Sequence, residues 1–126
     1  MPQPSWLDLH ELLQNHVHSG AVVFYAELEK YLCGTEGNAG LLQELIRSCA
    51  NHGKPTHLHR IVRKPTGDCA ELLGLYPGGP AIQRQKLKDG GVQFSGDNVD
   101  LKKTPAVFFK GKWQPGRLPE STCRLV

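Results

Sequence analysis

Two histidines and an arginine surround a leucine in the stretch PTHLHRIV, residues 55–62. His57 and His59 offer imidazole nitrogens, which act as bases or as metal ligands, and Arg60 offers a fixed positive charge. A nucleophile would complete a catalytic group of this kind, but Leu58, between the two histidines, has no reactive atom. The stretch therefore has the bases of a reactive site without its nucleophile.

A metal site is a second interpretation of the same region. Cys49, His52, His57 and His59 have the spacing C-x2-H-x4-H-x-H, and thiolate and imidazole are ligands that zinc prefers. The spacing matches no standard structural zinc site, so we expect neither a metal nor another cofactor. The cysteines at positions 33, 49, 69 and 123 form no CxxC pair and no compact disulfide framework, which predicts free thiols.

Charge is distributed unevenly along the 126 residues. Residues 1–53 hold six acidic and two basic side chains, and residues 54–126 hold six acidic and thirteen basic ones, which gives −4 and +7. A basic half suits a polyanionic partner such as DNA, although basic residues also commonly form a solvated surface.

The composition, 39% hydrophobic and 21% charged, is typical of a globular domain. No apolar run approaches the roughly 20 residues that span a bilayer, so we expect no membrane association. The acidic beginning of the sequence differs from the basic beginning of a secretion signal. These features predict an intracellular protein, cytoplasmic or nuclear.

Apolar spacing and turn residues predict the order of the elements. Ser5, followed three residues later by Asp8, predicts the start of a helix that ends before Ser19-Gly20. The elements that follow are a β-like run at 21–24, helices over 25–33 and from about 38 to 51, a strand-like run at 58–63, a helix beginning at Pro80, a small hairpin or an extended arm over 91–101, and an apolar core segment at 106–109. We expect a mainly α domain with a small β component over 1–112, and an extended, dispensable tail over 113–126.

Several of these segments resemble a known family. The stretches VVFYAELEKYL, HRIV, GLYPGG, IQRQKLKDGGVQF and NVDLKK, in this order, resemble the DNA-binding domain of alkylguanine-DNA alkyltransferases over about residues 20–103. The closing stretch is similar to their small relatives, the alkyltransferase-like proteins. The resemblance implies a winged helix-turn-helix fold that enters the minor groove and rotates a damaged guanine out of the stack.

The resemblance also indicates which residue Leu58 replaces. Alkyltransferases carry their alkyl-accepting cysteine in a Pro-Cys-His-Arg motif, whose last two residues match His59 and Arg60, and Leu58 stands at the cysteine position. Alkyl transfer requires a thiolate, so we expect a protein that is not an enzyme. A displaced nucleophile at Cys49 or Cys69 would need a rearranged pocket.

The resemblance implies three groups of DNA-binding residues. The groups are a base pocket with Tyr25 as the residue that rotates the base, a recognition helix, and phosphate contacts. The base pocket comprises Tyr25, Leu58, His59, Arg60, Tyr76, Gly78 and Gly79; the recognition helix begins with Asn38, Ala39, Gly40, Leu41 and Leu42; the phosphate contacts are Arg84, Lys86, Lys102 and Lys103.

The sequence departs from the family pattern at three places. The first turn of the recognition helix lacks the arginine that intercalates, and an arginine placed at Leu41 or Leu42 is expected to restore it. Pro77 replaces a serine of the pocket loop. The acidic partner of the histidine falls at Gly90, with Asp89 adjacent as a substitute.

Alkyltransferase-like proteins bind DNA containing alkylguanine without repairing it and hand the site to excision repair. By this resemblance we expect a monomeric, non-catalytic DNA-binding protein whose partner is double-stranded DNA containing alkylguanine, with excision-repair proteins as candidate partners. The alternative is a degenerate domain that serves as a protein-interaction module. The missing arginine, the acidic first half and the Pro/Gly-rich last segment favour this alternative.

Overall fold

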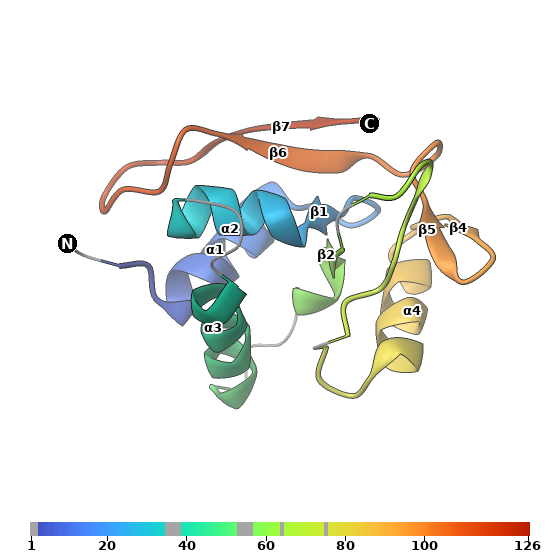
Figure 1. Ribbon diagram of the computed structural model, residues 1–126, viewed down its shortest axis with the longest axis horizontal. Helices are drawn as coiled ribbons and strands as arrows, with labels where there is room; N and C mark the ends of the chain where they lie inside the picture. The colour runs from blue at the N-terminus through green and yellow to red at the C-terminus, as the bar shows by residue number, and fades with distance from the viewer. Residues whose placement is uncertain (1–2, 35–38, 53–56, 64, 75) are drawn as a thin grey trace.

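The computed structural model describes residues 3–34, 39–52, 57–63, 65–74 and 76–126 (Figure 1). Within these ranges the elements follow one another as α1 (Trp6–His16), β1 (Val23–Phe24), α2 (Tyr25–Cys33), α3 (Ala39–Asn51), the 3-10 turn η1 (Leu58–Arg60), β2 (Ile61–Val62), β3 (Cys69–Ala70), α4 (Pro80–Asp89), β4 (Phe94–Ser95), β5 (Asn98–Asp100), β6 (Ala106–Lys110) and β7 (Glu120–Arg124).

The fold is mixed α/β, and the expectation of a mainly α winged helix-turn-helix domain is wrong. Of the described residues, 40% are helical and 21% are in strands, which form three small sheets. The difference arises mainly at β6 and β7, because β7 pairs with β6 where an extended tail was expected. The helices predicted at the start of the chain are confirmed as α1 and α2.

Local signals explain these two helices. In α1 the backbone N–H of Ser5 donates to the Asp8 carboxylate at 2.7 Å, which satisfies a group that the first turn leaves unpaired. The face of α1 that carries Leu9, Leu12 and Leu13 is buried. The helix α2 ends at Gly34, whose φ of 85° is a left-handed conformation that glycine adopts readily.

The pair β1–β2 lies between two apolar clusters. Its strands are parallel, with Val23 opposite Ile61. Because side chains alternate along a strand, Val23 joins a cluster beneath α1, α2 and α3, whereas Val22 and Phe24 join a second cluster around α4 and β5. This short strand pair therefore connects the two halves of the core.

The antiparallel pair β6–β7 lies across α1 and α2, at the top of the molecule in Figure 1. Three hydrogen bonds fix it there. The Phe109 N–H donates to Glu27 Oε1 of α2, the Trp113 N–H donates to the Tyr31 carbonyl, both at 2.9 Å, and Ser121 Oγ lies 2.9 Å from His16 Nδ1. Five residues of the segment 113–126, which was expected to be an extended tail, thus form the strand β7, and each of them pairs with β6.

This pairing predicts the effect of a truncation. Removing residues 113–126 deletes β7 and the partly buried Trp113, so the free energy of unfolding should fall by about 2 kcal/mol. Removing only Leu125 and Val126, which are exposed and follow β7, is the control. Urea unfolding of the two truncated chains measures the difference, and equal stabilities would show that β7 contributes nothing.

Candidate functional site

The turn η1 carries the degenerate motif and is built into the core. Leu58 is fully buried in the cluster beneath α1, α2 and α3. The Arg60 guanidinium donates to the carbonyl of Val17, the residue that caps α1, and burial lowers the pKa of Arg60. A cation at this position also suits the negative end of the helix dipole. Both side chains thus attach η1 to its neighbours.

A buried glutamine holds the same segment from the other side. Gln83 of α4 is fully buried, and its amide oxygen accepts from the Leu73 N–H at 2.9 Å. Its Nε2 donates to the carbonyls of His59 at 3.0 Å and Ile61 at 2.8 Å. Gln83 was not among the predicted site residues. Its spacing of four from the apolar Leu87 is the signal that places both on the buried face of α4.

Tyr25 lies at the opposite end of the strand pair from η1. It follows β1 directly, whereas Leu58–Arg60 precedes β2, and the parallel register leaves the two-residue strands between them. The Tyr25 side chain is half-buried against the first cluster. Burial, followed by the nearby Glu29 and Cys33, raises the pKa of Tyr25 to about 12, so its hydroxyl keeps its proton at neutral pH.

The predicted pocket loop is a tight turn that leads into α4. Tyr76 is buried in the first cluster, and burial raises its pKa. Gly78 and Gly79 have φ values of 96° and 90°, which favour glycine, and the Gly79 N–H donates to the Tyr76 carbonyl at 3.0 Å. Pro80 then occupies the first turn of α4, where a missing N–H costs nothing.

The hollow beside the motif is too small for a base. It lies between His59, Arg60, Lys86 and Gly90 and has a volume of about 10 Å³, close to the space of one water molecule. Ser19 Oγ donates to the Gly90 carbonyl at 3.1 Å and closes one side. Asp89 accepts instead from Gln85 within α4 at 2.8 Å, so its carboxylate is held on the surface.

The four expected phosphate contacts are in different environments. Arg84 lies 3.8 Å from Asp97, and Lys102 lies 3.4 Å from Asp68. Exposed ion pairs of this kind contribute little stability, but a carboxylate beside each cation opposes its attraction for a phosphate. Lys86 borders the small hollow, and Lys103 is exposed.

The start of α3 offers one open position for an intercalating side chain. Asn38 lies outside the described residues, and Ala39 is the first residue of the helix. Gly40 is exposed, and a Cβ added there would meet no atom within 4 Å. Leu41 is half-buried and Leu42 is fully buried. An arginine at Leu42 would bury a charge. Gly40 is therefore the position at which an added arginine tests whether an intercalating side chain strengthens DNA binding.

Two histidines, His52 and His57, each stack against a ring of α1. His57 lies against His10 with ring centroids 5.6 Å apart, and His52 lies against Trp6 at 4.4 Å. Burial, then Arg60, then His10 lower the pKa of His57. Nowhere in the described ranges do three His, Cys, Asp or Glu side chains gather closely enough to hold a metal ion.

Comparisons with protein-family models, with curated proteins and with solved structures find no match for this chain. In the described residues, no helix combines the length and the apolar character needed to cross a membrane.

The Gln83 contacts predict a large effect of one substitution. Gln83→Leu leaves the Leu73 N–H and the carbonyls of His59 and Ile61 without their partner, so the free energy of unfolding should fall by about 3 kcal/mol. Gln85→Leu changes an exposed glutamine of the same helix and should cost less than about 1 kcal/mol. Urea unfolding compares them, and equal losses would contradict the role given to Gln83.

The His57 pKa predicts how stability depends on pH. Because the pKa is lower in the folded than in the unfolded chain, the unfolded chain binds the proton more readily. The free energy of unfolding should therefore decrease as pH falls below about 6.5 and level off below the folded pKa. His57→Phe, which keeps a ring against His10, should weaken this dependence.

Exposed His18 provides the control for this substitution. Thermal unfolding of wild type, His57→Phe and His18→Phe between pH 5 and pH 8, a range of about three units around the histidine pKa, measures the slopes. An unchanged slope in His57→Phe would contradict the assignment.

Proposed function

We propose that this protein binds DNA without catalysing a reaction and that it recognises duplex containing alkylated guanine. The observation that carries the proposal is the convergence of distant segments. The parallel β1–β2 pairing places the β1–α2 junction and the Leu58–Arg60 turn at the two ends of one short strand pair, and the Gln83 hydrogen bonds attach α4 to that turn. These are the segments to which the resemblance assigns DNA contact.

The non-catalytic part of the proposal rests on the chemistry of the turn. Leu58 has no atom that accepts an alkyl group, and its side chain is fully buried. Cys49 is also fully buried, and burial raises the pKa of its thiol and that of Cys33. A raised pKa lowers the fraction of thiolate, which is the reactive form.

Recognition of a flipped base requires the hollow between His59, Arg60, Lys86 and Gly90 to open. The hollow of about 10 Å³ beside His59 holds no base in its present form. Opening it costs part of the binding free energy, in addition to the few kcal/mol needed to unstack a base. We therefore expect weak binding, with a preference for the damaged duplex because a damaged base unstacks more easily.

A protein-interaction module is the second candidate. The closed hollow favours it, and so does β7. All five residues of β7 are exposed, and its partner in the sheet is β6 alone. An open strand edge is a site where an extended segment of another protein can add a strand.

Fluorescence anisotropy of labelled duplexes, with and without one alkylguanine, tests the proposal at two salt concentrations. Binding that weakens with salt is expected, because phosphate contacts release counterions. Gly40→Arg should strengthen binding, since the position is open to solvent. Tyr25→Phe should weaken binding to the damaged duplex by about 1 kcal/mol through the lost hydroxyl contact.

Two lysines of α4 provide a matched pair for the same assay. Lys86→Glu, beside the motif, should weaken binding, whereas Lys88→Glu, which changes the net charge equally, should do so less. Mass spectrometry of the incubated protein should find no alkyl group on any cysteine. No salt-dependent binding at micromolar concentration, together with a gain in Gly40→Arg, would leave the interaction module as the function.

A further inference from the structure

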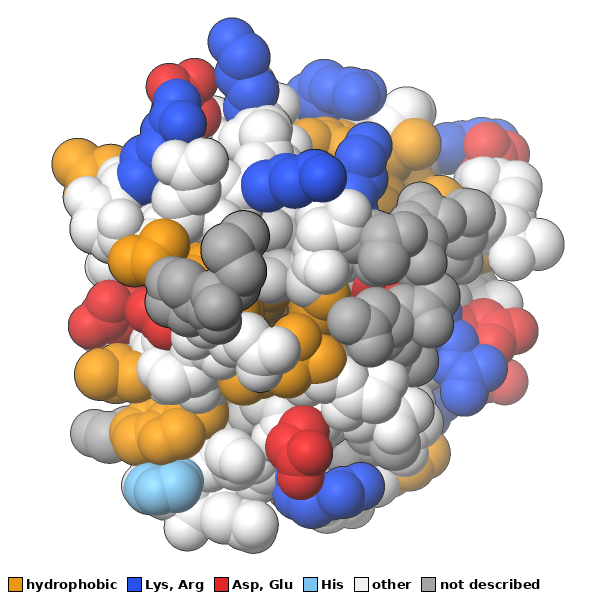
Figure 2. Space-filling model, turned by 60° about the vertical axis from the view of Figure 1, so that its left-hand side comes forward, with side chains coloured by type: hydrophobic (Ala, Val, Ile, Leu, Met, Phe, Trp, Pro, Cys, Tyr) orange, Lys and Arg blue, Asp and Glu red, His pale blue; other side chains and the backbone are white. Residues whose placement is uncertain are grey.

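The surface of β6, β7 and their connecting loop is basic. Between residues 106 and 124 the basic residues are Lys110, Lys112, Arg117 and Arg124, and the acidic residue is Glu120. Figure 2 shows Lys and Arg side chains gathered along the upper edge of the molecule, over this hairpin. The loop that joins β6 to β7 lies at the left of Figure 1, whereas α4, which carries Arg84 and Lys86, lies at the right.

A hollow of about 410 Å³ opens within this basic surface. It lies between Tyr31, near the end of α2, and the loop that joins β6 to β7. Lys110, Lys112 and Arg117 contribute three positive charges to its lining, Glu120 contributes one negative charge, and Leu118 adds an apolar side chain. Its volume is in the range of small-molecule sites, and its net charge is +2.

The loop that forms the hollow is held in place by backbone contacts. The Trp113 N–H donates to the Tyr31 carbonyl at 2.9 Å, and the Arg117 N–H donates to the Gln114 carbonyl at 3.2 Å. The Trp113 side chain packs against the first core cluster. A site that is ordered before binding loses less conformational entropy when a ligand arrives.

The three bases of the hollow are available to a ligand. In the described part of the chain, no carboxylate oxygen lies within 4 Å of Lys110, Lys112 or Arg117. Among the described residues, the Arg117 guanidinium makes one side-chain hydrogen bond, a weak one at 3.5 Å to the amide oxygen of Gln114. Arg84 and Lys102, by contrast, have carboxylate partners.

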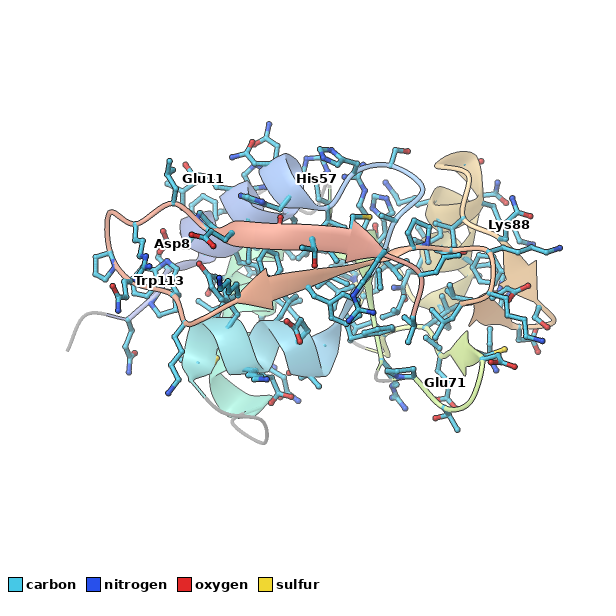
Figure 3. All side chains as sticks on the ribbon, turned by 90° about the horizontal axis from the view of Figure 1, so that it is seen from above. Asp8, Glu11, His57, Glu71, Lys88 and Trp113 are labelled. Atoms are coloured by element: carbon cyan, nitrogen blue, oxygen red, sulfur yellow. The ribbon has the colours of Figure 1, made fainter. Side chains whose placement is uncertain are left out.

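The charges around the loop favour binding of an anion on its α2 side and not on its α1 side. Burial raises the pKa of Tyr31, and the Arg117 charge partly opposes this effect; both residues line the hollow. Asp8 and Glu11 of α1 line a separate hollow on the other side of Arg117. Figure 3 shows both acids beside the loop on its α1 side.

We propose that the hollow binds a phosphorylated small molecule. A phosphate group offers oxygens that accept from the Lys110 and Lys112 ammonium groups and from the Arg117 guanidinium, and charge-assisted bonds of this kind are the stronger ones. Leu118 and Tyr31 provide apolar contact for the remainder of the ligand, and Glu120 accepts from a hydroxyl. This site is independent of the proposed DNA function.

NMR titration of the 15N-labelled chain tests the proposal with inorganic phosphate, adenosine monophosphate and uncharged adenosine as probes. The amides of Gly111, Lys112 and Gln114, which line the hollow, should shift with the two phosphates at up to about 10 mM and should not shift with adenosine. Lys112→Gln and Arg117→Gln should each weaken binding of adenosine monophosphate about threefold. Lys103→Gln, an exposed lysine elsewhere, should leave it unchanged.

The outcomes separate this site from DNA binding. Loop shifts with a DNA duplex but with neither small phosphate would overturn the proposal and make the hollow a phosphodiester contact. No loop shifts with either small phosphate, or equal affinities in wild type and both loop variants, would also overturn it. Lys86→Glu should leave the small-phosphate shifts intact, so the failure of one proposal does not imply the failure of the other.

Discussion

The position of the motif depends on one buried amide. The Gln83 side chain has two donor hydrogens and an acceptor oxygen, and it uses them on the backbone of Leu73, His59 and Ile61. A buried polar group that is satisfied in this way favours one arrangement, because any displacement leaves it without partners. The hydrogen bond to the Ile61 carbonyl also holds β2 beside β1, where Ile61 lies opposite Val23. This strand pair connects the two apolar clusters.

The polar and apolar side chains of the motif stabilise the fold. Leu58 fills the core where the resemblance places a nucleophile, and Arg60 binds the carbonyl that ends α1. A reactive site must keep its nucleophile accessible and its bases free to exchange protons. Here the turn is instead packed and hydrogen-bonded, and the hollow beside it is nearly closed.

The hairpin combines two roles on opposite faces. Val107 and Phe109 of β6 belong to the core cluster over α1 and α2, whereas Lys110 and the residues of β7 are exposed. In β6 strand alternation separates buried Val107 and Phe109 from exposed Lys110, whereas every residue of β7 is exposed. The hairpin and its loop thus present Lys110, Lys112, Arg117 and Arg124 to solvent, while Arg84, Lys86 and Lys88 lie on α4.

The sequence by itself determined α1 and α2, because helix caps and apolar spacing depend on residues close together in the chain. It also showed that Leu58, between two histidines, has no reactive atom. It did not indicate β7, whose residues Glu120–Arg124 are all exposed and lack apolar alternation. Nor did it distinguish open Gly40 from buried Leu42, or show that Lys102 has a carboxylate partner. Only the tertiary structure decided these points, because strand pairing, burial and ion pairs join residues that are distant in sequence.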